Sequence, residues 1–263
     1  MAEKLSAAGR ADTSGERERA YERFKAVLAV HGAAIQAFEA LPALPNGREA
    51  VAAGIRLSRG MDPSLAPENV DDFVSRMFDS IQQERVAGYT TIRSSALIAA
   101  CGAFEYLLKA TFVDQAMAEP SKAASLLAKK RIRLLASEVL ACPETEQWFL
   151  IADRLFDQLA DDERQMHKRV KLFLLGYTLL PWRDEQEEMV EKAFASVDAV
   201  RFDEAFLVRN SIVHNGGRVS AALSQCSQRR LSELIVFERK SLEPLLKPLR
   251  TVAEALNSLW MVL

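Results

Sequence analysis

Cysteine, glycine and histidine are scarce in this chain, and each shortage excludes a class of protein. The three cysteines, Cys101, Cys142 and Cys226, are odd in number and have no CxxC spacing. Neither a disulfide framework nor a zinc site is therefore indicated. No Gly-rich phosphate loop, HExxH motif or EF-hand pattern occurs among the 11 glycines and 3 histidines, so we expect no metal and no cofactor.

Neither sign of charge dominates, and long apolar runs are also missing. The net charge is -2 and the sequence pI is near 6.0, so any contact with nucleic acid must come from a local basic patch. The N-terminal segment has no apolar core of signal-peptide length, and the apolar stretches look too short to span a bilayer. We expect a cytoplasmic protein without membrane contact.

Helical periodicity is the main feature that is present. Apolar residues recur at intervals of three and four, period-two alternation is missing, and the sequence predicts an all-α helical bundle. Residues 1–16 are small and polar and predict a disordered tail. Pro-rich breaks at 41–47 and 60–67 indicate an N-terminal helical subdomain over 17–84, followed by a bundle over 85–263. Helices are predicted over 17–40, 48–57, from 68 onward, 89–117, 121–141, 144–159, 165–177, 184–196, 201–214, 231–246 and 249–261.

The stretch FLVRNSIVHNGG, residues 206–217, carries the most informative polar residues of the chain. Arg209, Asn210 and His214 lie near the end of an apolar helical run, and the two glycines that follow can close the helix. Asn210 and His214 are i,i+4 neighbours on one face, and Ser211 is three residues before His214. Arg209 and His214 point in different directions around the helix. If two copies of the helix met across a two-fold axis, arginines and histidines of both copies would lie in one cleft and could reach one phosphate.

This stretch resembles the HEPN superfamily of helical-bundle proteins. Its ribonuclease members carry an arginine, four to six residues and then a histidine, often with a polar residue directly after the arginine. The corresponding run here is Arg209-Asn-Ser-Ile-Val-His214, followed by Asn215. A weaker similarity covers residues 97–109, where Glu105 lies in an apolar helix. The resemblance extends from about Tyr89 to the C-terminus, and the N-terminal helices are additional to it.

The resemblance implies metal-independent cleavage of RNA by a homodimer, with the active cleft at the subunit junction. His214 suits general acid–base chemistry near neutral pH, and Arg209 offers a permanent cation to the developing phosphorane. Asn210 is expected to orient the imidazole or bind the phosphate, with Ser211 and Asn215 in supporting positions. A toxin–antitoxin or antiviral-defence role, with an antitoxin or regulatory protein as partner, follows from the family alone.

Several other polar residues carry weaker expectations. Glu105 is expected to pair with Arg209 or another arginine and hold the catalytic helix in place, or to lie at the solvent edge. His167 lies in a mixed-charge segment and is expected to face water. A basic set could guide an RNA backbone, although a helical charge cluster also suits a solvated face; its members are Lys129, Lys130, Arg131, Arg133 and Arg218.

Two other functions fit the same sequence. HEPN proteins include non-catalytic interaction modules, in which Arg209 pairs with an acid, His214 caps the helix and the helix forms a protein interface. The other possible function is that of a nucleotide-binding or nucleotide-transfer accessory domain.

Overall fold

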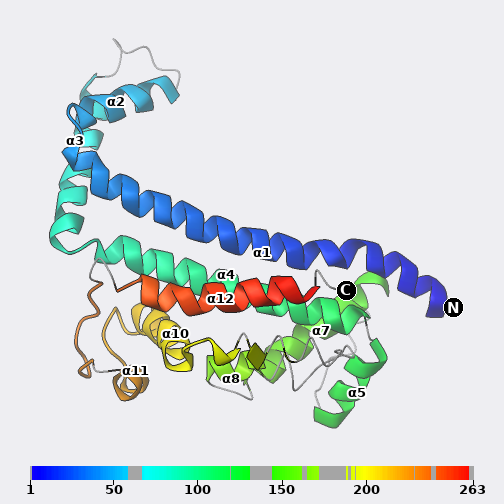
Figure 1. The fold of residues 1–263 in the computed structure, drawn as a ribbon. Coiled ribbons are helices and arrows are strands. Elements are labelled where there is room, and N and C mark those ends of the chain that lie inside the picture. The colour runs from blue at the N-terminus through cyan, green and yellow to red at the C-terminus, as the bar shows by residue number, and fades with distance from the viewer. Residues whose placement is uncertain are drawn as a thin grey trace.

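The computed structural model is built from helices stacked along a long first helix (Figure 1). It describes residues 2–58, 67–118, 120–130, 144–161, 165–171, 188, 191–192, 194–227, 229–237 and 241–260. This part of the chain contains no strand, and one isolated bridge joins Arg218 to Leu234. The expectation of an all-α protein is confirmed. The elements are α1 (Ala2–Ala40), η1 (Leu41–Ala43), α2 (Gly47–Ser58), α3 (Pro67–Val86), α4 (Thr90–Ala118), α5 (Pro120–Lys130), α7 (Glu144–Asp161), α8 (Met166–Lys171), α10 (Ala199–His214), α11 (Ala221–Cys226) and α12 (Glu243–Trp260).

Most helix boundaries agree with the local sequence signals, but three segments differ. The backbone is helical from Ala2, where a disordered tail was predicted, since the segment is rich in alanine and continues directly into α1. The helix predicted over 231–246 is wrong in its first half. There the backbone forms hydrogen bonds with the segment after α10 instead of within a helix. Val219 N–H donates to Glu233 O and Ile235 N–H donates to Gly217 O, both at 2.8 Å. Helix α12 then runs through Pro248 without a break.

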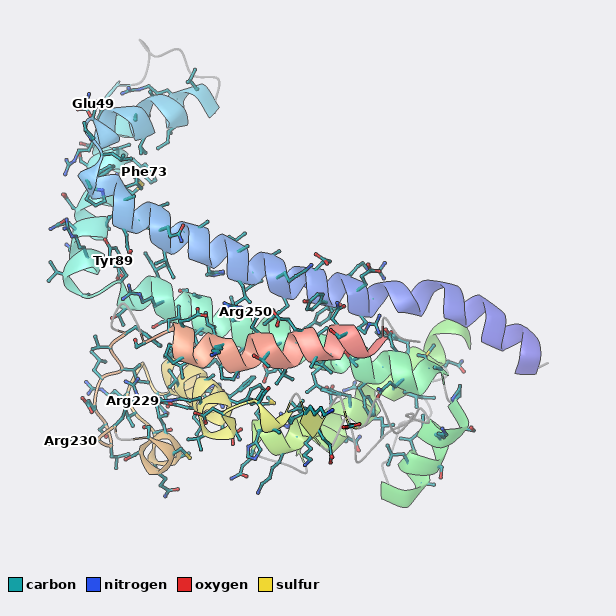
Figure 2. All side chains as sticks on the ribbon, viewed as in Figure 1. Glu49, Phe73, Tyr89, Arg229, Arg230 and Arg250 are labelled. Atoms are coloured by element: carbon teal, nitrogen blue, oxygen red, sulfur yellow. The ribbon has the colours of Figure 1, made fainter. Side chains whose placement is uncertain are left out.

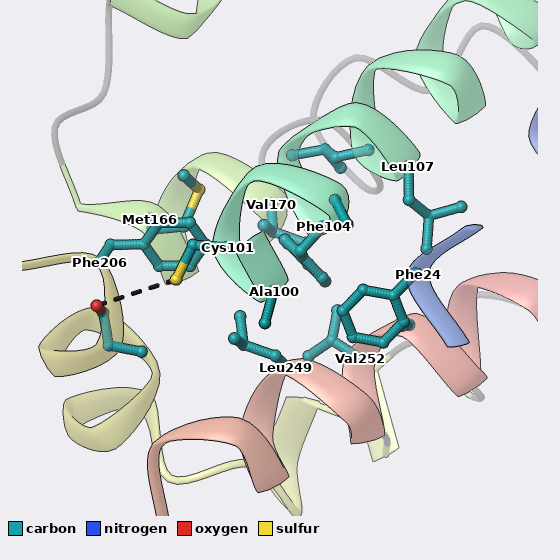
Figure 3. Packing of buried hydrophobic residues seen from close by; sticks show 14 of the residues in the cluster. Phe24, Ala100, Cys101, Phe104, Leu107, Met166, Val170, Phe206, Leu249 and Val252 are labelled. Atoms are coloured by element: carbon teal, nitrogen blue, oxygen red, sulfur yellow. Dashed lines mark hydrogen bonds between the residues drawn. The ribbon is translucent and has the colours of Figure 1, made fainter. Parts of the chain in front are cut away.

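Helix α4 is the centre of the main core. Helices α1, α7, α10 and α12 all pack against it, which explains why α4 is apolar on nearly all sides. The Phe104 ring meets Phe24 of α1 and Phe202 and Phe206 of α10 edge-on, with centroid distances of 6.2, 5.5 and 6.1 Å. Figure 3 shows this packing, in which Phe104 lies between α1, α10 and α12. The aromatic contacts fix the position of α10, which carries the candidate site.

The N-terminal region contributes to two separate clusters. Ala20 and Phe24 of α1 are buried in the main core. Helices α2 and α3 form a smaller cluster of their own around Val74 and Phe78. Figure 1 shows α2 projecting away from the bundle and α3 passing the end of α1 to reach the start of α4, whereas α1 itself runs along the bundle.

Arg93 ties the start of α4 to two distant segments. Its side chain is 3% exposed. The guanidinium donates to the carbonyl oxygens of Gly88 and Phe237, and to Glu39 Oε1 at 3.0 Å. These bonds join the end of α1, the start of α4 and the irregular segment that precedes α12, so they hold the chain that follows α10 against the bundle.

Two helices reach the length and composition of membrane spans, Gly15–Ala43 and Thr90–Ala118. The apolar stretches are thus longer than the sequence reading suggested. The most apolar window of the second, which is α4, is 67% buried inside the bundle. Because a buried core helix meets the same criteria, these stretches do not establish where the protein resides.

Candidate functional site

Arg209 is held between two oxygen acceptors on the face where α10 meets α4. One terminal nitrogen donates to Glu105 Oε2 at 2.8 Å and the other to Asn210 Oδ1 at 2.7 Å. Of the two alternatives for Glu105, the pair with Arg209 is therefore the one present. Arg209 Nε is buried and has no hydrogen-bond partner among the described residues. The arginine is 25% exposed, so its guanidinium is oriented from within the protein and still borders solvent.

Glu105 is partly withdrawn from water. Burial raises the pKa of its carboxyl above the ordinary value, and the positive charges of Arg209 and Arg169 oppose that rise. The Arg169 charge comes from α8, so α4, α8 and α10 all contribute charged groups to this region. The sequence left open whether Glu105 has a partner and did not predict the approach of α8.

His214 is the last residue of α10 and is exposed. Its ring makes no hydrogen bond within the described part of the chain. The helix ends as predicted, because Gly216 and Gly217 take φ values of 58° and 77°. The backbone N–H groups of Asn215 and Gly217 both donate to Ser211 O, at 3.0 and 3.2 Å. The imidazole is therefore presented to solvent at a well-defined helix end, on the same face as Asn210.

Ser211 is turned into the protein. It is fully buried, and its hydroxyl donates to Ser220 Oγ at 3.1 Å while the Ser220 N–H approaches it at 3.4 Å. Ser220 is the N-cap of α11 and accepts from Leu223 N–H. Ser211 therefore connects the end of α10 to the start of α11 and does not face the surface that carries His214. Asn215, the other supporting residue, is exposed.

Of the predicted basic set, the structure describes Arg218 with its side chain and only the backbone of Lys129 and Lys130. Arg218 is exposed and donates to the carbonyl of Ser232 at 3.1 Å. Lys129 and Lys130 end α5, which lies at the other end of the bundle from α10 and α11 (Figure 1). Their side chains, and Arg131 and Arg133 altogether, lie outside the described residues. Two further arginines, Arg229 and Arg230, lie on the segment after α11 (Figure 2), and Arg229 approaches the buried Glu204 at 3.9 Å.

His167 is the polar residue that sequence reasoning misplaced. It is half-buried rather than turned to water, and its ring Nδ1 donates to Asp203 Oδ2 at 2.7 Å. The backbone N–H of His167 donates to the other Asp203 oxygen at 2.9 Å. The two residues are 36 positions apart in the sequence, so no local motif could have predicted their contact.

The described residues form no candidate metal site, and the described pocket lies at a place other than Arg209. In the described parts of the structure, no group of three or more histidine, cysteine, aspartate or glutamate side chains is placed so that it could hold a metal ion. A shallow pocket of about 330 Å³ lies between α1 and α12, lined by Tyr21, Phe24, Leu28 and Arg250 among others. None of its lining residues belongs to α10, so this pocket is separate from the candidate site.

Comparison of the chain with protein-family models, curated proteins and solved structures found no match.

Proposed function

We propose that the protein is a metal-independent endoribonuclease of HEPN type that acts as a homodimer. The observation that carries the proposal is the arrangement at the end of α10. A guanidinium oriented by Glu105 and Asn210 lies on the same short helical stretch as an exposed imidazole. The resemblance of residues 209–214 to the ribonuclease members of the superfamily is the second support.

Each residue has a role that its surroundings allow. Cleavage through the ribose 2′-hydroxyl needs a proton acceptor, which the exposed His214 ring can supply. It also needs a fixed cation for the phosphorane, and Arg209 has N–H groups beyond the two already engaged. Asn210 acts by holding Arg209, because its oxygen accepts from the guanidinium. Glu105 holds the same guanidinium from α4.

The proposal is tested with purified full-length protein and an unstructured RNA oligonucleotide in the presence of EDTA. We expect cleavage that leaves a 2′,3′-cyclic phosphate and a 5′-hydroxyl, and no cleavage of the 2′-deoxy oligonucleotide. His214→Ala and Arg209→Ala should each lower the rate at least about 100-fold. Arg250→Ala is the matched control, since Arg250 forms an exposed pair with Glu243 on α12. RNA cleavage that survives in both α10 variants contradicts the proposal.

A non-catalytic interaction module is the second candidate, and exposed apolar side chains near the same helix end favour it. Val213 is 49% exposed, and Leu234 and Val236 on the neighbouring segment are exposed as well. Leu234 lies beside Gly217, directly after α10. Under this reading Val213→Asp abolishes association with a partner or a second copy, and the wild-type protein cleaves no RNA.

A further inference from the structure

The pair formed by His167 of α8 and Asp203 of α10 has no part in the proposed mechanism. Asp203 accepts from both the ring Nδ1 and the backbone N–H of His167, at 2.7 and 2.9 Å. An ionised carboxylate only accepts, so the Nδ1 proton stays in place and Nε2 is the nitrogen free to exchange a proton. The His167 side chain is 27% exposed. This histidine is therefore oriented by a carboxylate while part of its ring borders solvent.

Helix α8 exposes basic side chains next to the pair in the sequence. Met166 and Val170 bury α8 against the core, as Figure 3 shows, and this leaves Lys168 and Lys171 exposed. The basic residues of α8 are Lys168, Arg169 and Lys171. The charge of Arg169 acts on Glu105, the carboxylate that holds Arg209. A positive charge of α8 thus acts on the carboxylate that orients Arg209.

The spacing along α10 decides how His167 could take part. Asp203, which holds His167, and His214 are eleven residues apart, or about 16 Å along a helix axis. In a two-fold pairing of antiparallel α10 helices centred near Asn210, position 214 of one copy lies opposite position 206 of the other. Position 206 is three residues from Asp203, or about 4.5 Å along the helix axis. Asn210, Val213 and His214 are exposed on this end of the helix.

We propose that His167 of one copy and His214 of the partner subunit are the two proton-transfer groups of one composite site. This inference rests on the proposed dimeric ribonuclease. The partner's His214 takes the 2′-hydroxyl proton, and the 2′-oxygen attacks phosphorus. The bond from phosphorus to the 5′-oxygen breaks, its electron pair stays on that oxygen, and His167 Nε2–H supplies the proton. Asp203 is a positioning residue, because it fixes the ring and does not touch the substrate.

Single variants test the role of His167. His167→Gln keeps an amide donor for Asp203 but cannot transfer a proton. We expect kcat to fall at least about 100-fold with KM little changed, and one limb of the pH–rate profile to disappear. Asp203→Asn should also lower kcat. This variant provides the test of His167 if His167→Gln does not fold. The control is His31→Gln, whose ring bonds to Val27 O within its own helix.

Mixing variants tests whether the site is composite. His167→Gln and His214→Ala subunits are each expected to be inactive as homodimers. In a mixed dimer, one of the two sites combines His167 of one subunit with His214 of the partner subunit and is intact. Random exchange of equal amounts should therefore restore about a quarter of the wild-type rate. If both histidines acted within one chain, no site in the mixture would be intact and no activity would return.

The outcomes separate the inference from the function on which it rests. Wild-type cleavage with full activity in His167→Gln overturns the inference and leaves the ribonuclease proposal standing. Cleavage without recovery in a mixture whose subunit exchange is verified, or cleavage by a monomer, also overturns it. If the wild-type protein cuts no RNA, both proposals fail together.

Discussion

Arg209 of α10 donates to Glu105 of α4 at 2.8 Å, although 104 residues separate them in the sequence. The arginine is 25% exposed and the glutamate 34% exposed. The pair lies beside the contact of Phe104 with Phe202 and Phe206, so the same two helices that build the core also orient the guanidinium. A change at Glu105 therefore acts on stability and on the candidate site together.

Glu105→Ala is expected to destabilise the protein by about 1 to 3 kcal/mol, because Arg209 loses a charged acceptor in a partly buried place. Under the proposed function it also lowers RNA cleavage by releasing the guanidinium. Urea unfolding and the cleavage assay measure the two effects. Glu188→Ala is the control, since it removes an exposed pair with Lys192 and should change stability by less than about 1 kcal/mol. Equal effects of the two substitutions would contradict this account of Glu105.

Arg93→Met is expected to cost about 3 kcal/mol or more. The substitution leaves Glu39 and two carbonyl oxygens without their buried donor. Thermal or urea unfolding measures the loss. Arg48→Met removes an exposed ion pair with Asp79 at 3.5 Å, and we expect it to change stability by about 0.5 kcal/mol. A small loss for Arg93→Met would mean that the end of α1 and the segment before α12 are held by other contacts.

Asp114 predicts a dependence of stability on pH. Burial raises the pKa of its carboxyl to about 7, while the charge of Arg17 on α1 opposes the rise. The folded state therefore holds a proton that the unfolded chain releases, so the contribution of Asp114 to stability is full at low pH and is lost as pH rises to about 7. Asp114→Asn cannot ionise, so its stability relative to wild type should improve between pH 4 and pH 8. Urea unfolding at both pH values checks this, and a difference that stays constant or worsens would contradict it.

Gly217→Ala is expected to cost about 1 to 2 kcal/mol and to loosen the end of α10. Gly217 has φ +77°, a left-handed conformation that alanine adopts at a steric cost. Gly32→Ala is the matched control, since Gly32 lies inside α1 with nothing within 4 Å of an added Cβ. There the greater helix propensity of alanine should stabilise the protein by up to about 1 kcal/mol. Unfolding of both variants measures the contrast, and the same sign in both would contradict it.

The sequence was informative where structure depends on neighbouring residues. The end of α1 before Leu41-Pro42, the span of α4 and the closure of α10 at Gly216 and Gly217 were all predicted, because proline, glycine and apolar spacing act locally. Segment 231–237 was predicted as helix, since its composition allows one. Its backbone groups instead bond to residues 217 and 219, and that choice depends on tertiary contacts.

The features of the candidate site also divide into those set by neighbouring residues and those set by tertiary contacts. The sequence by itself determined an all-α protein, a helix ending at His214, and the placement of Arg209, Asn210 and His214 on its last turns, since all of these depend on residues within a few positions of one another. Only the tertiary structure decided that Arg209 meets Glu105, that Ser211 is buried against Ser220, and that Asp203 holds His167. These contacts join residues from 9 to 104 positions apart. Which charges become partners across such distances depends on how the helices pack around α4.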